Sequence, residues 1–249
     1  DCVIAGSNFI FKHISENYSE YVPKMKKFLV IFRGINTEYY DPNNINKKDR
    51  SKFFSKLNIE PGKKIILLPG RLTSWKGQEL LIEALNILKT NFGYKNFVAI
   101  ILGSDQGRDT YKKKLVRLVE QHRLNNDVIF LEHANSMPIA YSIANVVVSA
   151  SIEPEAFGRV SVEAQSMKKP IIASDIGGSR ETIIDNRTGL LFRSEDPKSL
   201  SEKIDNIFRS DDTTLNAMGN SGRKNVEQKF NVEKMCFSTY SEYKKLINA

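Results

Sequence analysis

The stretch from Ile65 to Leu88, IILLPGRLTSWKGQELLIEALNIL, decides the predicted fold. It begins with a short run of apolar side chains, Ile65 to Leu68, which is typical of a strand buried on both faces of a sheet. From Gln78 to Leu88 the apolar residues recur at spacings of three and four, so this part is predicted to be an amphipathic helix. A buried strand followed by such a helix indicates one βα unit of a parallel sheet.

The same alternation continues along the chain. Tyr111 to Val119 has helical spacing, and short apolar runs recur at Phe97 to Leu102, Val128 to Leu131, Val146 to Val148, Ile171 to Ala173 and Leu190 to Phe192. Strands that alternate with helices on this scale require right-handed crossovers and helices on both faces of the sheet. The sequence therefore predicts an α/β fold with a doubly wound parallel sheet.

The first forty residues follow a different pattern. Two strand-like segments, Val3 to Ala5 and Phe28 to Phe32, flank a predicted helix from about Asn8 to Asn17. We interpret residues 1–35 as the end of a preceding domain with its connector, and Asp41 to Asn46 as the linker, because it is rich in turn formers. The chain begins without Met and without the layout of a signal peptide, so we expect most of that preceding domain to be missing.

The part after Phe192 is predicted to be helical to the end. Pro197 is expected near a helix start, and Asp211 to Leu246 is expected to form one or two further helices. The predicted division of the chain is a remnant with its connector in residues 1–35, a main domain in residues 36–231, and a C-terminal helix in residues 232–249 that crosses back to the first domain.

Composition limits the possible classes of protein. The 249 residues are 41% hydrophobic and 27% charged, and no apolar run approaches the roughly 20 residues that a membrane helix needs. The net charge of +8 comes from lysines spread along the chain, which argues against nucleic acid and suits anionic small molecules or an anionic membrane surface. Two cysteines, Cys2 and Cys236, cannot build a disulfide framework or a four-thiolate zinc site. We expect a cytoplasmic protein, with peripheral association at the inner face of the membrane as an option.

Polar residues follow the predicted strands at one edge of the sheet. In an open parallel sheet, ligands bind beyond the carboxyl ends of the strands. Five loops therefore converge on one rim: Gly70-Arg71, Gly103-Ser104-Asp105, Glu132-His133, Ser149 to Gly158, and Asp175 to Gly178.

Arg71 and Lys76 lie between the first of these strands and the helix that opens near Gly77. Two cations beside a helix N-terminus make an anion site, because unpaired amides and the helix dipole add to the side-chain charges. Taken alone, an Arg and a Lys in a loop are more often simply solvated.

The segment from Glu153 to Ala164, EPEAFGRVSVEA, is more specific. Gly158 allows the backbone to approach a ligand closely, and the helix that follows directs its first amides at the rim. If Glu155 and Glu163 lay on one helix, the rise of 1.5 Å per residue would place them about 12 Å apart. A glycosidase acid/base pair needs about 5 to 9.5 Å, so separate binding roles are favoured.

Four motifs together resemble one enzyme family. They are GRxxxxKG at 70–77, EAFGRVxxEA at 155–164, SDIGGSRE at 174–181 and TGLL at 188–191. In order and spacing, over roughly residues 60–210, they resemble the retaining glycosyltransferases of the "group 1" family, which have the GT-B fold. The sequence around Arg71 and Glu155 is similar to bacterial transferases of lipopolysaccharide core or related envelope glycans. The resemblance implies the Rossmann-like, C-terminal half of a GT-B fold, which binds the nucleotide sugar.

The resemblance also implies roles for individual residues. Arg71 and Lys76 would hold the diphosphate of the sugar nucleotide and stabilise the departing phosphate. Glu155 would accept hydrogen bonds from sugar hydroxyls, and these three residues would be the catalytic ones. Glu163 would hold the ribose hydroxyls, and the loop from Leu131 to Met137 would pack on the base. The other residues expected to contact the nucleotide sugar are Gly70, Gly103, Ser104, Leu131, His133, Ala156, Phe157, Gly158, Arg159 and Val160.

The implied function is transfer of a sugar, with retention, from a nucleotide diphosphate sugar to a glycan or glycolipid such as lipopolysaccharide. A hexosyltransferase of this kind needs no protein nucleophile, cofactor or metal, and the acceptor would be held by the missing first domain, so the fragment alone is expected to be inactive. Two alternatives stay open: a nucleotide-sugar epimerase or phosphorylase, and a binding module without catalysis. His13, His122 and His133 have no metal-like spacing, and the base of the nucleotide (uracil, guanine or adenine) is not indicated.

Overall fold

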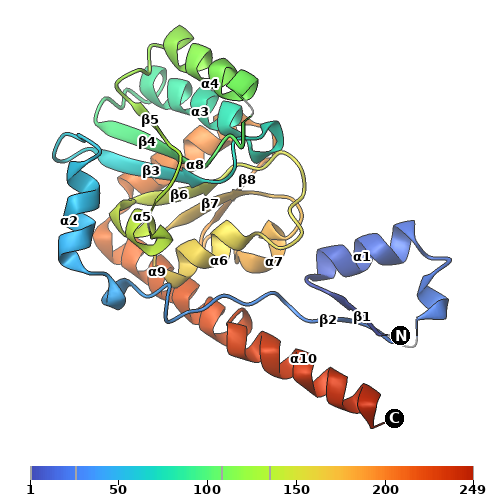
Figure 1. Ribbon diagram of the computed structural model, residues 1–249. Helices are drawn as coiled ribbons and strands as arrows, with labels where there is room; N and C mark the ends of the chain where they lie inside the picture. The colour runs from blue at the N-terminus through green and yellow to red at the C-terminus, as the bar shows by residue number, and fades with distance from the viewer. Residues whose placement is uncertain (1, 26, 108, 135, 249) are drawn as a thin grey trace.

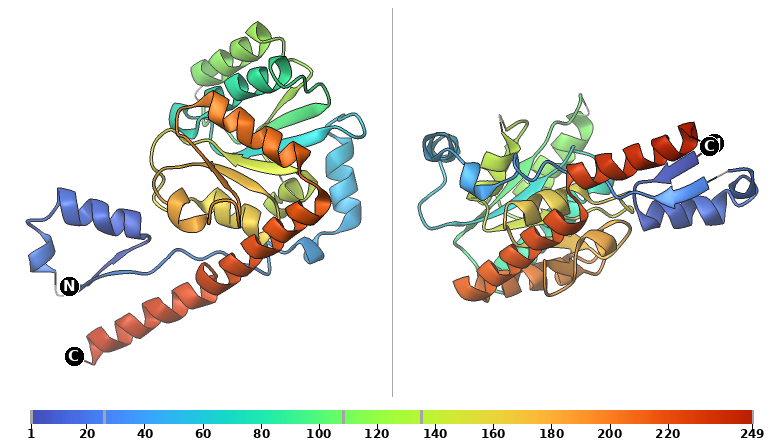
Figure 2. Two further views of the ribbon diagram at one scale, coloured as in Figure 1. Left: turned by 180° about the vertical axis from the view of Figure 1, so that it is seen from behind. Right: turned by 90° about the horizontal axis from the view of Figure 1, so that it is seen from below.

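The computed structural model describes residues 2–25, 27–107, 109–134 and 136–248 (Figure 1). It consists of a body, which holds a six-stranded parallel sheet with helices on both faces, and an arm formed by residues 2–32. The C-terminal helix leaves the body and runs beside the arm, as the two views of Figure 2 show.

The sheet confirms the predicted α/β, doubly wound architecture. Its strands are β3 (Lys64–Pro69), β4 (Phe97–Leu102), β5 (Val128–Leu131), β6 (Val146–Ser149), β7 (Ile171–Ser174) and β8 (Leu190–Phe192). They pair in parallel in the order β5-β4-β3-β6-β7-β8. The chain therefore builds outward from β3 to β5, then returns to place β6 on the other side of β3. Ligands in such sheets bind where the strand order reverses, so the β3/β6 junction is the point of interest.

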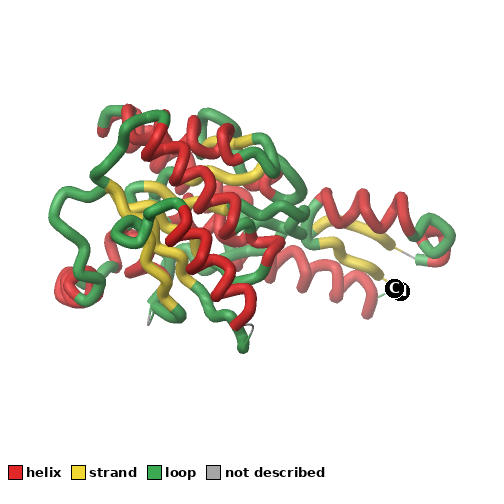
Figure 3. Tube along the Cα trace, turned by 90° about the horizontal axis from the view of Figure 1, so that it is seen from above, coloured by secondary structure: helices red, strands yellow, loops and turns green. Residues whose placement is uncertain are grey.

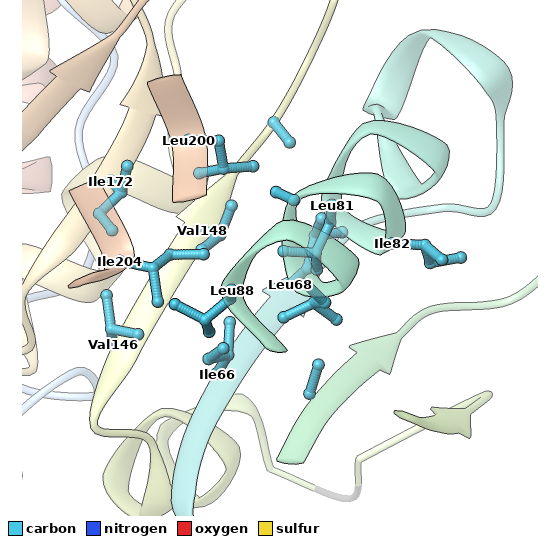
Figure 4. Close-up of a cluster of buried hydrophobic side chains, with 14 of the residues drawn as sticks. Ile66, Leu68, Leu81, Ile82, Leu88, Val146, Val148, Ile172, Leu200 and Ile204 are labelled. Carbon is cyan, nitrogen blue, oxygen red and sulfur yellow. The ribbon is translucent and has the colours of Figure 1, made fainter. Parts of the chain in front are cut away.

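The helices form two layers on either side of the sheet (Figure 1), and Figure 3 shows the same molecule from above. One layer contains α3 (Gln78–Thr90), α4 (Asp109–Gln121) and α8 (Pro197–Arg209). The other contains α2 (Lys47–Ser55), α5 (Met137–Ile143), α6 (Arg159–Ser166), α7 (Ser179–Thr182) and α9 (Asp212–Lys229). Alternate residues of β3 supply the two cores: Ile66 and Leu68 pack with the first layer (Figure 4), and Ile65 and Leu67 with the second. The strands are apolar throughout because both faces of the sheet are buried.

Most predicted elements exist with slightly different ends. The expected linker contains a short 3-10 turn, η2 (Pro42–Asn44), and Pro197 is the first residue of α8, as predicted. Helix α2 was not predicted, because Phe53 and Phe54 are the only apolar residues among its nine. The Asn46 side chain accepts hydrogen bonds from the amides of Lys48 and Asp49 and so caps this helix.

The arm contains a parallel pair of strands, β1 (Cys2–Ala5) and β2 (Lys27–Val30), with α1 (Asn8–Asn17) and the 3-10 turn η1 (Val22–Lys24) between them. Phe11 of α1 stacks on Phe28 of β2, with ring centroids 4.1 Å apart. Apart from the buried Ala5, the strand residues of the arm are only half-buried, in contrast to most of those in the body.

Helix α10 (Val232–Ile247) connects the body to the arm. Where α9 ends and α10 begins, Ile35 donates to the Phe230 carbonyl and accepts from the Val232 amide, both at 2.9 Å. Further along, Glu242 forms an ion pair with Lys27 of β2. Three aromatic side chains of this helix are exposed, Phe237, Tyr240 and Tyr243. Within the described ranges, none of the helices combines the length and apolarity required to cross a membrane.

Candidate functional site

The loops that follow β3 and β4 touch each other at the rim. A Cβ atom added at Gly103 would lie 2.0 Å from the Gly70 carbonyl oxygen, so only glycine allows this approach. The Leu72 amide then donates to the Ser104 carbonyl at 3.0 Å. Gly70, Gly103 and Ser104, three of the predicted residues, are thereby brought together at the carboxyl edge of the sheet.

Lys76 and Glu155 meet across the β3/β6 junction. The Lys76 Nζ atom lies 2.8 Å from Oε1 of Glu155, and both side chains are largely buried. The Ser151 hydroxyl donates to the same oxygen at 2.5 Å. Lys76 Nζ also lies 4.3 Å from the centroid of the Trp75 ring, a cation–π contact that keeps it over the rim.

Backbone geometry explains why this lysine reaches that carboxylate. The 3-10 turn η3 (Ser74–Lys76) ends at Gly77, whose φ is +69°. A Cβ atom there would lie 1.9 Å from the Ala150 carbonyl oxygen, so the glycine lets the turn sit directly on the end of β6. The Ile152 amide donates to the Trp75 carbonyl at 2.8 Å and fixes the two loops together. Arg71 is exposed on the same loop, and its carbonyl accepts from the Gln78 side chain at 2.8 Å.

The segment from Ala156 to Val160 leads into α6. Gly158 has a φ of +82° and precedes the helix without a side-chain cap. Within the described ranges, no hydrogen-bond acceptor is found for the amides of Arg159 and Val160 at the start of α6. Phe157 anchors the segment by packing its buried ring edge-on against Phe230, at 5.6 Å between centroids. The helix therefore presents unpaired amides at the rim, as an anion site requires.

Glu163 lies deeper, in the second turn of α6, and is buried. Its Oε2 atom accepts from the Tyr141 hydroxyl at 2.8 Å, and its Oε1 atom from Nε of Arg159 at 2.7 Å. Burial, together with the charge of Glu163, raises the pKa values of both Tyr141 and Tyr40 above the ordinary range. Both tyrosines therefore stay neutral, and the Tyr141 hydroxyl remains a donor.

Several residues of the site could not be found from sequence. Ser151, Tyr40 and Tyr141 carry no motif or spacing that distinguishes them from ordinary polar and core residues. The nearest signal is the position of Ser151, two residues after the end of β6.

The predicted base-binding loop follows β5, two strands from β3 in the sheet. His133 is exposed and Leu131 is half-buried, while Glu132 pairs with Lys112 of α4 at 2.9 Å. Residue 135, inside the predicted range, lies outside the described residues. Among the described residues, no group of three or more His, Cys, Asp or Glu side chains is placed to hold a metal ion.

Comparison with known proteins gives a family and several relatives. The family described as "Glycosyl transferases group 1" matches residues 49–225. A glycosyltransferase structure from Rickettsia africae is 33% identical, with a TM-score of 0.91 over 99% of this chain and 64% of that one. HepE from Anabaena, crystallised with UDP and glucose, is 24% identical, with a TM-score of 0.86 over 98% of this chain and 62% of that one.

A third relative is the capsular polysaccharide biosynthesis glycosyltransferase CapM from Staphylococcus aureus. It is 29% identical over 185 residues, which are 74% of this chain and 46% of CapM. The chain spans between 46% and 64% of the length of the first curated relatives that it matches.

Proposed function

This chain belongs to the group 1 glycosyl transferase family, and we propose that it binds the nucleotide diphosphate sugar from which a retaining transferase takes its sugar. The observation that carries the proposal is the Lys76–Glu155 pair at the β3/β6 junction, beside the unpaired amides of α6. These groups place cations and amide donors next to a carboxylate. A nucleotide diphosphate sugar offers the complementary groups, since it joins an anionic diphosphate to a ring of hydroxyls.

The diphosphate is assigned to the cationic side of this arrangement. Lys76, Arg71 and the first amides of α6 can all donate to phosphate oxygens, and the helix dipole favours negative charge at the same place. We assign the sugar to Glu155, because its Oε2 atom accepts no hydrogen bond from the described part of the chain. The ribose hydroxyls are assigned to Glu163, and the base to the loop after β5.

In the proposed reaction an acceptor hydroxyl attacks the anomeric carbon on the face from which the nucleotide diphosphate departs. The departing phosphate takes the hydroxyl proton, so the configuration is retained and no side chain forms a covalent intermediate. Arg71 and Lys76 stabilise the charge that grows on the leaving oxygen. Their contribution is electrostatic, which is the larger part of catalysis in reactions of this type.

The proposed acceptor is a glycan or glycolipid of a bacterial envelope, such as lipopolysaccharide. Support comes from the sequence around Arg71 and Glu155 and from the capsular polysaccharide role in the name of CapM. The net charge of +8 also suits work beside an anionic cytoplasmic membrane surface.

The test is calorimetric binding of UDP, GDP and ADP with EDTA present. At least one should bind without a divalent metal, and Lys76→Ala should weaken it about tenfold, the scale of one charge-assisted hydrogen bond. The matched control is Lys95→Ala, which removes the same charge from an exposed residue near the amino end of β4. Binding that is lost in EDTA and restored by magnesium or manganese would contradict metal-independent binding. Equal affinities for the two variants would contradict the role of Lys76.

A further inference from the structure

The arm is fastened to the body beside the proposed sugar site. The carboxylate of Glu181 in α7 accepts hydrogen bonds from the first residues of α1, although more than 170 positions separate them. Its Oε2 atom accepts from the amide and the side chain of Asn8, both at 2.8 Å, and its Oε1 atom from the Phe9 amide at 2.6 Å. Figure 1 shows α1 and α7 side by side.

These bonds complete the N-terminus of α1. The first amides of a helix have no partner within it and need outside acceptors. The amide of Ile10 donates to the Ser7 hydroxyl oxygen at 3.1 Å, which leaves those of Asn8 and Phe9 for Glu181. A carboxylate at this position also interacts favourably with the helix dipole. Ser7 of the arm therefore caps one amide of α1, and the body supplies the acceptor for the two amides that Ser7 does not pair.

The same corner of the body holds Glu155. The Gly178 amide donates to the Glu155 carbonyl at 2.8 Å, and the Glu181 amide donates to the Gly178 carbonyl at 3.1 Å. A Cβ atom at Gly177 would lie 2.8 Å from the Glu155 carbonyl oxygen, so these backbones are in direct contact. On the arm's side, the buried Ser7 hydroxyl donates to the Ala156 carbonyl.

We propose that Glu181 is a positioning residue that clamps the start of α1 onto the segment carrying Glu155 and so holds Glu155 in place for the sugar. The proposal rests on the proposed function of Glu155. If the proposal holds, loosening the arm also disturbs the sugar site, because the backbone of Gly177, Gly178 and Ala156 contacts both the arm or α7 and the segment of Glu155.

The first measurement is amide hydrogen exchange in Glu181→Gln. The variant loses the charge and one of the two acceptor oxygens, and its amide nitrogen would face a backbone N–H. We expect exchange at Asn8 and Phe9 to be about tenfold faster or more, given the strength of charge-assisted hydrogen bonds. If the clamp positions Glu155, the Gly178 amide must also exchange faster. The control is Glu202→Gln, which neutralises an exposed carboxylate on α8.

The second measurement separates positioning from general destabilisation. Affinities of both variants are compared for UDP and GDP and for UDP-glucose and GDP-mannose. Glu181→Gln should weaken a sugar nucleotide several-fold more than the matching nucleoside diphosphate, because Glu155 is assigned to the sugar alone. A purely structural effect would weaken both forms equally.

The outcomes are distinct. If the amides of Asn8 and Phe9 exchange equally fast in Glu181→Gln and in the control, Glu181 does not hold the start of α1, and the proposal is wrong. Faster exchange there with an unchanged Gly178 amide overturns the link to Glu155. Failure of the unmodified chain to bind any of the four ligands overturns the proposed function. In that case the exchange rate of the Gly178 amide in Glu181→Gln alone tests whether Glu181 holds the segment that carries Glu155.

Discussion

Two carboxylates of the EAFGRVSVE segment, eight positions apart, are held in opposite ways. Glu155 lies on a loop, and both of its contacts, from Lys76 and Ser151, converge on a single oxygen. Glu163 lies within a helix, and both of its oxygens are engaged, one by Tyr141 and the other by Arg159. One carboxylate keeps an acceptor available at the rim, whereas the other is enclosed.

Because of this difference, a ligand must break an existing hydrogen bond to reach an oxygen of Glu163 but not to reach Oε2 of Glu155. A ligand hydroxyl that reaches Oε2 of Glu155 breaks no hydrogen bond to that oxygen from the described residues. At Glu163, the Tyr141 bond is buried, while the Arg159 side chain is 74% exposed and can move into solvent. If Glu163 binds the ribose as proposed, the diol would replace Arg159 at Oε1, and Tyr141 would hold the carboxylate in orientation.

The largest expected effect is at Glu163. Glu163→Ala should weaken binding of a nucleoside diphosphate by about 1.5 to 3 kcal/mol, the scale of hydrogen bonds to a charged group. Calorimetry on a folded variant measures this loss. Tyr141→Phe keeps the carboxylate and removes only the hydroxyl that orients it, so this variant should lose less affinity than Glu163→Ala. Unchanged affinity in Glu163→Ala would exclude the ribose role, and an equal loss in both variants would show that binding depends on the orientation that Tyr141 gives the carboxylate.

A smaller and more selective effect is expected at Glu155. Glu155→Ala should leave the affinity for UDP or GDP unchanged and weaken a sugar nucleotide by about 1.5 kcal/mol, the lower end of the scale for hydrogen bonds to a charged group, because the residue is assigned to the sugar hydroxyls. Glu153→Ala is the matched control, since it removes an exposed carboxylate from the same loop. A loss of affinity for the free nucleoside diphosphate would mean that Glu155 acts on Lys76 and the phosphate.

The sequence predicted the sheet well because burial on both faces leaves a strong signal. The run Ile65 to Leu68 lies within β3, and the motif residues Gly70, Lys76 and Glu155 all lie at the rim as the parallel arrangement requires. The roles assigned to those residues stay predictions. The switch point between β3 and β6 could not be read from the chain, since strand order depends on packing between distant elements.

The missed features depend on contacts between distant parts of the chain. Helix α2 carries too few apolar residues for a periodic signal, and its boundary comes from the Asn46 cap. Tyr141 appears in sequence as an ordinary apolar position of a short helix, and only the fold places its hydroxyl on Glu163. The Glu181 carboxylate accepts from the Phe9 amide of α1, although 172 positions of sequence separate the two residues. Local sequence patterns therefore cannot predict such contacts between distant residues.

The smallest effect is expected at Arg159. It tests the comparison most sharply, because the substitution should raise the affinity for the nucleotide and not lower it. If a ribose diol must displace Arg159 from Oε1 of Glu163, Arg159→Ala should raise affinity for a nucleoside diphosphate. An i,i+4 ion pair on a helix contributes about 0.3 to 0.5 kcal/mol, which corresponds to about a twofold gain in affinity. Calorimetry with duplicate titrations resolves such a change.

The chain contains a close counterpart of this arrangement at the other edge of the sheet. Asp205 in α8 is buried and accepts from the Tyr94 hydroxyl at 2.9 Å and from Nε of Arg209 at 2.7 Å, although here both bonds reach the same oxygen, Oδ1. Arg209→Ala therefore removes an equivalent exposed ion pair, far from the rim, and should leave nucleotide affinity unchanged. A loss of affinity in Arg159→Ala alone would show instead that the guanidinium binds the phosphates, and Glu163 would then lose its proposed competitor. A gain confined to Arg159→Ala would establish that the enclosed carboxylate is opened by its ligand.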